Sequence, residues 1–256
     1  MRFGPVRTAS VSAFYLGSKM HVIHRAANLG DFGTLRRLLA EGVSVDTRSA
    51  SGFTPLHRVC FAPTTTDDRE ACFKLLRDAG ANLEATAAGG YAPLHYAAED
   101  RNKPGLVSIV SLLIEAGVNV NVANSYGTTP LHNAAKWGSE ATVAMLVKAG
   151  AAVNVSNDLG KRPLHYARDH NPRVCHILLR AGASLVPSYY MSNPPKFAVP
   201  VLVTEQYLQR VTDAGGFKKY EQAHLARITK ILAPTPRLPP EMVRKIVEFW
   251  LHAGYY

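Results

Sequence analysis

The sequence predicts an all-α solenoid of helix–turn–helix repeats with short β-hairpin loops, followed by a C-terminal helical module. Two observations carry this prediction. A motif containing Pro-Leu-His recurs at steps of 38, 37 and 33 residues, and a leucine-rich helical block recurs in phase with it. Self-similarity at such a period is typical of repeat arrays, whose units bury their apolar faces only by stacking on one another.

The chain opens with an N-terminal arm, residues 1–19, which carries basic, serine and small apolar residues and no acidic residue. This composition is compatible with a disordered arm, with a cap on the first repeat, or with a transit segment. The sequence leaves these three alternatives open.

The first helix of each repeat is marked by the recurring motif. Proline fits the first position of a helix because the N–H it lacks has no partner there, and a preceding threonine can cap the helix. Small residues follow the motif and allow neighbouring first helices to approach closely. The copies are Thr54–His57, Ala92–His95, Thr129–His132 and Arg162–His165, with a degenerate copy at His21–His24.

The second helix of each repeat has apolar residues at helical spacing and then a glycine. A glycine at this place indicates a helix end that requires a left-handed residue. We expect Gly117 and Gly150 to have this conformation. The blocks are LRRLLAEGVSVD, FKLLRDAGANLE, VSLLIEAGVNVN, VAMLVKAGAAVN and CHILLRAGASLV.

These two phased motifs resemble the ankyrin repeat, and the resemblance covers five copies over about residues 20–186. The second and third copies depart from the pattern by extra residues near 62–68 and 100–105, between the two helices of the repeat. Insertions there leave the stacking faces intact. The resemblance implies a protein-binding scaffold that uses a concave surface of hairpin tips and first helices.

Four histidines recur at one position of the repeat, namely His57, His95, His132 and His165. A metal site needs side chains that converge on one point, whereas one histidine per repeat forms a row along the stack. We therefore expect a structural role, in which each imidazole hydrogen-bonds a neighbouring turn, and no metal ion.

The resemblance also places a partner-binding surface on the variable positions of the tips and first helices. Aromatic residues at such positions are typical of interface hot spots. For Phe53 and Tyr91, packing on the neighbouring hairpin is an equal alternative to partner contact, whereas contact is favoured for Tyr126 and Trp137. The predicted binding residues are Phe53, Phe61, Tyr91, Tyr126, Lys136, Trp137, Leu159 and Lys161.

A proline-rich linker, residues 187–203, and a helical module, residues 204–256, follow the repeats. One interpretation is a helical cap that covers the last repeat. The other starts from Leu238, Pro239, Glu241 and Met242, which are similar to the opening of an F-box and to the shortened PRANC module. That similarity implies docking to a ubiquitin ligase, with the repeats holding the substrate.

Composition narrows the function further. The net charge of +10 is spread along the chain, which mildly favours acidic partners but lacks the dense basic patch of a nucleic-acid groove. Three sparse cysteines favour a reducing compartment, and no apolar run is long enough for a membrane span. We expect a non-enzymatic scaffold or adaptor without cofactor or small-molecule substrate, located in the cytoplasm, with nuclear or organellar import as alternatives.

Overall fold

The computed structural model describes residues 8–61, 66–100 and 104–184, together with residues 210, 213–216, 219–220 and 222–223. The chain divides into two compact units, Met1–Pro130 (unit 1) and Leu131–Tyr256 (unit 2), which we describe separately. The linker at 187–203 lies outside the described residues, as do nearly all of the module at 204–256 and parts of both insertions.

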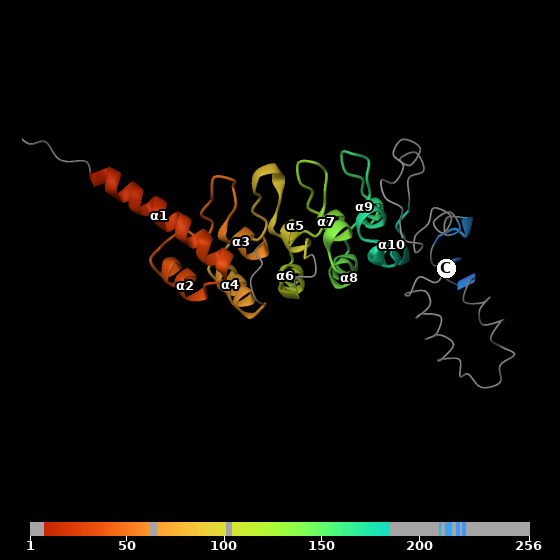
Figure 1. Ribbon diagram of the computed structural model, residues 1–256, viewed down its shortest axis with the longest axis horizontal. Coiled ribbons are helices and arrows are strands. Elements are labelled where there is room, and N and C mark those ends of the chain that lie inside the picture. The colour runs from red at the N-terminus through yellow and green to blue at the C-terminus, as the bar shows by residue number, and fades with distance from the viewer. Residues whose placement is uncertain are drawn as a thin grey trace, which may run out of the picture. The chain divides into compact units, whose positions relative to one another are not determined.

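Unit 1 contains three helix pairs, and the all-α repeat architecture is confirmed there. First helices α1, α3 and α5 pack in one row, and second helices α2, α4 and α6 pack in another (Figure 1). The alanines that end the motif are buried, as close helix packing requires. The elements are α1 (Thr8–Leu29), α2 (Phe32–Ala40), α3 (Pro55–Phe61), α4 (Thr66–Asp78), η1 (Ala88–Gly90), α5 (Pro93–Ala97) and α6 (Pro104–Glu115).

Unit 2 repeats the arrangement with two helix pairs, in which α8 and α9 both pack against α10. Its core includes Leu131, Leu146, Leu164 and Leu178, all fully buried. The elements are α7 (Pro130–Trp137), α8 (Glu140–Lys148), α9 (Pro163–His170), η2 (Pro172–Val174) and α10 (Cys175–Arg180).

Helix α1 differs from the other first helices by its length of 22 residues. It takes in much of the segment that the sequence assigns to the N-terminal arm. Lys19, near its middle, forms an ion pair with Glu41 at the end of α2, with Nζ 2.6 Å from Oε2. The first helix pair is therefore also joined just before the degenerate motif copy at His21–His24.

Each motif proline is the first residue of its helix. The histidine two positions later satisfies a backbone N–H at the start of that helix. In α5 and α9, no side chain of the residue before the proline caps the helix. Instead, Nδ1 of His95 accepts the N–H of Ala92 at 3.1 Å, and Nδ1 of His165 accepts that of Arg162 at 3.0 Å. His57 makes the same bond to Thr54, whose Oγ1 in turn accepts the His57 N–H at 3.5 Å, so that the two residues cap the start of α3 reciprocally.

The second helices end as their glycines predict. Gly117 follows α6 with φ of 78°, and Gly150 follows α8 with φ of 89°. These positive φ values lie in the left-handed region, where a side chain adds strain.

Tight hairpins connect successive repeats. A backbone hydrogen bond closes each one, such as that from Ala87 N to Tyr91 O at 2.8 Å. Within unit 1 neighbouring hairpins are also bonded to each other, with Ser125 N donating to Gly89 O at 2.9 Å. No regular strand is assigned among the residues that the structure describes, so the hairpins are turns supported by their neighbours.

Candidate protein-binding surface

In unit 1 the structure brings three predicted binding residues together around Tyr96, which sequence reasoning missed. We call Phe53, Phe61, Tyr91 and Tyr96 the aromatic cluster. The Tyr96 ring centroid lies 5.1 Å from Phe53, 5.8 Å from Phe61 and 5.6 Å from Tyr91. These are separations at which aromatic pairs attract through their quadrupoles as well as through buried area.

Exposure differs across the aromatic cluster. Phe61, at the end of α3, is 48% exposed, whereas Phe53 and Tyr91 are half-buried. Phe53 and Tyr91 thus pack on neighbouring rings and still keep an accessible face. Burial raises the pKa of Tyr96 to about 12, so its hydroxyl remains protonated at neutral pH.

Tyr126 lies on the next hairpin and is 58% exposed. Asn124 shapes this hairpin, because its Oδ1 accepts the N–H of Tyr126 at 2.9 Å and that of Thr128 at 3.0 Å. A Cβ placed on Gly89 would meet the ring of Tyr91 at 3.3 Å and that of Tyr126 at 3.7 Å. The two tyrosines therefore flank the same glycine, and Tyr126 extends the accessible aromatic surface.

In unit 2 a second group forms around Tyr166, on α9. We call Lys136, Trp137, Lys161 and Tyr166 the Lys–Trp cluster. The Nζ of Lys136 lies 4.9 Å from the Trp137 ring and 5.7 Å from the Tyr166 ring, and the Nζ of Lys161 lies 5.3 Å from Tyr166. Cations over aromatic faces at these distances are attracted by the ring quadrupole.

The Lys–Trp cluster is bounded by charged and apolar neighbours. Asp169 balances part of its charge, with Oδ2 3.7 Å from Lys161 Nζ and Oδ1 2.8 Å from Arg168. The Trp137 ring packs against His170 at 5.6 Å, and burial with Lys136 nearby lowers the pKa of that histidine. Leu159, at the hairpin tip of this unit, is 71% exposed.

The repeated histidines hold the backbone beneath these predicted binding residues. Nε2 of His57 donates to Tyr91 O at 3.1 Å, and Nε2 of His132 donates to Lys161 O at 3.0 Å. His95 reaches Thr128 O in the same way at 2.9 Å. Since Nδ1 of His57 and His95 already accepts a helix-start N–H, hydrogen bonding assigns their proton to Nε2. His57, His95 and His132 thus each couple one first helix to the next hairpin.

Burial strongly depresses the basicity of these rings. It lowers the pKa of His57 to about 4 and that of His165 to about 4, and it also lowers the pKa of His95. All three are neutral at physiological pH, which is the state that their hydrogen bonds require.

The residues that sequence reasoning missed share one position, immediately after the repeated histidine. This position holds Tyr96 and Tyr166 at the centres of the two clusters, and Arg58, whose guanidinium lies 4.6 Å from the Phe53 ring centroid. The residue there changes from repeat to repeat while small residues follow it. That contrast is a sequence signal for a position whose side chain differs between repeats, and in α7 the position holds Asn133, which is buried.

The predicted docking residues Leu238, Pro239, Glu241 and Met242 lie outside the described residues. None of the helices that the structure describes combines the length and apolar character needed to cross a membrane.

Comparison with known proteins adds one match. A family model described as ankyrin repeats, in three copies, matches residues 23–123 and 94–187, which is more than half of the chain. A search of the curated proteins finds no match.

Proposed function

Because the chain belongs to the ankyrin-repeat family, which generally mediates protein–protein interactions, we propose that it is a non-enzymatic scaffold or adaptor that binds a protein partner. The partner contacts the hairpin tips and first helices. In unit 1 it contacts the aromatic cluster and Tyr126, and in unit 2 it contacts the Lys–Trp cluster and Leu159.

One observation carries this proposal. Large apolar side chains remain exposed beside ordered rings, with Phe61 at 48%, Tyr126 at 58% and Leu159 at 71%. Aromatic residues such as tyrosine and tryptophan are enriched in interface hot spots, and they bury a large area for little lost conformational entropy. Rings already held by their neighbours lose even less freedom on binding.

The state of the nucleophilic groups supports a role without catalysis. Burial raises the pKa of Cys60 to about 12 and that of Cys175 to about 12, so both are protonated thiols at neutral pH. A cysteine nucleophile requires the thiolate. His57 likewise uses both ring nitrogens in hydrogen bonds that hold the fold.

Crosslinking in cells followed by affinity recovery would test the proposal. We expect Phe61→Ala and Trp137→Ala each to reduce recovery of a specific crosslinked protein at least tenfold without lowering the melting temperature by more than a few degrees. Phe32→Ala is the matched control, because Phe32 is similarly exposed at 37% but begins the second helix α2. Equal recovery by all three variants would refute this choice of surface.

A second candidate function is a substrate receptor of a ubiquitin ligase, and the sequence at Leu238–Met242 favours it. In that case cullin-ligase components should be recovered together with the partner. Leu238→Asp should remove the ligase components and leave the repeat-bound partner in place. A recovered complex without any ligase component would exclude this candidate.

We also propose that the chain acts in the cytoplasm, since buried free thiols at Cys60, Cys72 and Cys175 suit a reducing compartment. Imaging of a C-terminally tagged full chain, compared with a chain lacking residues 1–19, would detect import directed by the arm.

A further inference from the structure

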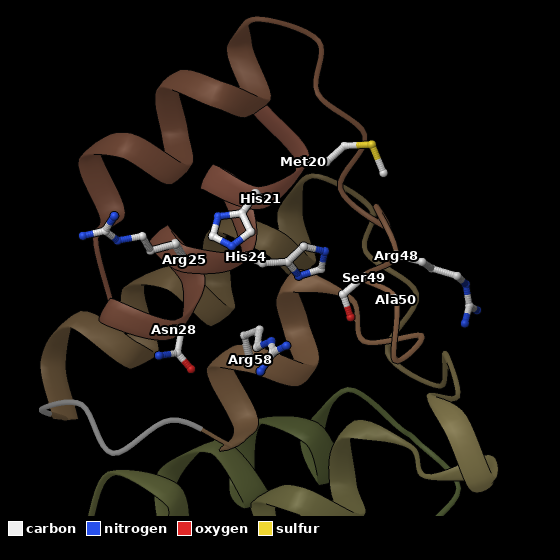
Figure 2. Close-up of a pocket in the computed structure, with 9 residues that line it drawn as sticks. All are labelled: Met20, His21, His24, Arg25, Asn28, Arg48, Ser49, Ala50 and Arg58. Carbon is white, nitrogen blue, oxygen red and sulfur yellow. The ribbon is translucent and has the colours of Figure 1, made fainter. Parts of the chain in front are cut away.

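Unit 1 contains a basic pocket of about 500 Å³ between α1, the first hairpin and α3. Five basic side chains contribute to its wall, and none of its lining residues is acidic. They are His21, His24, Arg25, Arg48 and Arg58 (Figure 2). Positive charge concentrated in a concave site with low-dielectric walls attracts anions more strongly than the same charge spread over a surface.

His24 differs from its equivalents in the later repeats. It is 8% exposed, and neither ring nitrogen has a hydrogen-bond partner among the described residues. The backbone of Thr47 approaches closely enough to affect its pKa but does not complete a hydrogen bond. Burial, with Arg58 and His21 nearby, lowers that pKa. A buried polar ring without a protein partner is costly, so a polar group that enters the pocket and hydrogen-bonds this ring would be favoured.

The arginines of the pocket carry charge that the fold does not balance. Neither Arg25 nor Arg58 forms an ion pair with any residue that the structure describes. Arg48 is held in place by backbone carbonyls, donating to Thr86 O at 2.7 Å and to Gly52 O at 3.4 Å. Figure 2 shows the guanidinium groups of Arg25 and Arg48 directed to opposite sides, with Arg58 and the His24 ring between them. Cationic groups spread in this way suit several single charges along a chain better than one phosphate.

Arg58 joins the pocket to the aromatic cluster. Its guanidinium lines the pocket and also lies 4.6 Å from the Phe53 ring centroid. Phe53 in turn contacts Phe61 and Tyr96. An extended chain leaving the pocket past Arg58 would therefore reach accessible aromatic surface.

We propose that the basic pocket binds an acidic peptide segment of the partner protein, with spaced carboxylates at Arg25, Arg48 and Arg58 and an apolar residue on the aromatic cluster. This inference rests on the proposed scaffold function and specifies the chemistry of its partner. The overall net charge of +10 attracts such a segment before contact.

Fluorescence anisotropy with the full chain tests the proposal. The probe is a dye-labelled peptide of four glutamates followed by phenylalanine, and the reference probe replaces the glutamates with glutamines. We expect the acidic peptide to bind at least tenfold more tightly than the reference, and the difference to shrink with salt. Arg58→Gln and Arg25→Gln should each weaken the acidic peptide at least tenfold, whereas Arg58→Lys should weaken it less.

Arg36→Gln is the matched control, since Arg36 is an exposed arginine of α2 outside the pocket. It removes the same charge and should change the affinity less than twofold. Melting temperatures of the variants identify any loss that comes from unfolding. Arg58→Lys keeps the positive charge but removes the planar guanidinium, so it shows how much of the effect comes from charge alone.

Equal affinity for the two peptides, or equal losses with Arg36→Gln and Arg58→Gln, would overturn the proposal. An oligothymidylate of the same charge that binds equally well would also overturn it, because the site would then be a general polyanion site. The scaffold function has a separate readout. If Phe61→Ala still abolishes partner recovery while the acidic peptide fails to bind, only the pocket proposal falls.

Discussion

At the residue scale, His57 shows how a repeated histidine stabilises both the start of its own helix and the next hairpin. In His57, Nδ1 accepts the Thr54 N–H that begins α3, and Nε2 donates to Tyr91 O in the next hairpin. The bond at Nδ1 requires the neutral ring, because both nitrogens of a charged imidazole are donors, and the ring is fully buried. A charged imidazole in that position would lose a hydrogen bond and pay for desolvation.

Stability should therefore fall in mild acid. The unfolded chain binds a proton on this histidine near pH 6.5, whereas the folded chain binds it only near pH 4. The contribution of neutral His57 to the free energy of unfolding is complete above pH 6.5 and is lost as the pH falls toward 4. A pKa difference of this size between the folded and unfolded chain corresponds to about 3 kcal/mol. Urea unfolding at several pH values should show this decline. His57→Gln should flatten the decline, and an unchanged slope in that variant would contradict the assignment.

Two glycines of unit 1 allow the cost of backbone strain to be distinguished from the cost of steric contact. Gly90 and Gly117 have nearly equal φ values, 75° and 78°. A Cβ on Gly90 would lie 2.9 Å from Ser125 N, whereas one on Gly117 would meet nothing within 4 Å. Alanine at Gly117 should cost about 1 kcal/mol through strain alone. Alanine at Gly90 should cost at least about 1 kcal/mol more, because it also displaces the hydrogen bond from Ser125 N to Gly89 O.

Thermal unfolding of Gly90→Ala and Gly117→Ala measures this difference directly. Each variant serves as the control for the other, since the backbone conformation is shared. Equal melting temperatures would show that the hairpins containing Gly89 and Ser125 can move apart without loss of stability.

At the scale of elements, short helices depend on how they begin. Helix α8, Glu140–Lys148, starts after Ser139, whose Oγ accepts the N–H of Thr142 at 3.2 Å. A helix of nine residues is marginal by itself, so an unsatisfied N–H at its start weighs heavily.

Ser139→Ala should destabilise unit 2 by about 1 kcal/mol, because it removes this cap. Ser156→Ala is the matched control, since Ser156 is exposed and lies between helices α8 and α9 of the same unit. We expect that control to change the free energy of unfolding by less than about 0.5 kcal/mol. A Ser139→Ala variant as stable as the control would mean that other groups satisfy the start of α8.

At the scale of the whole molecule, stability depends on what covers the last helix pair. Unit 2 buries Leu164 and Leu178 in its last helix pair. A terminal repeat requires a polar outer face or a cover, and the apolar residues of 204–256, Phe249 and Trp250 among them, could supply it.

Truncation after Val186 should therefore give a protein that melts markedly lower than the full chain or aggregates. Size-exclusion chromatography and thermal melting of the truncated and full chains measure both effects. A monomeric truncation with unchanged melting would instead favour an independent docking module, consistent with the ubiquitin-ligase candidate.

The sequence by itself determined the helix pairs and their phase. Proline at the start of a helix and glycine after its end act through the local backbone, so their positions could be read without knowledge of any neighbour. Pro55 and Pro93 begin helices, and Gly117 has a left-handed φ, as the sequence indicates. The family model confirms the repeats over residues 23–187.

Only the tertiary structure decided which accessible side chains meet. Phe61 and Tyr96 belong to different repeats, and 35 positions separate them in the sequence, yet their rings lie 5.8 Å apart. The basic pocket likewise combines Arg25, Arg48 and Arg58 from three elements. Such contacts depend on how helices and hairpins stack, which no local preference specifies. The histidine motif marks where each repeat begins, but the stacking determines what the residue beside it can bind.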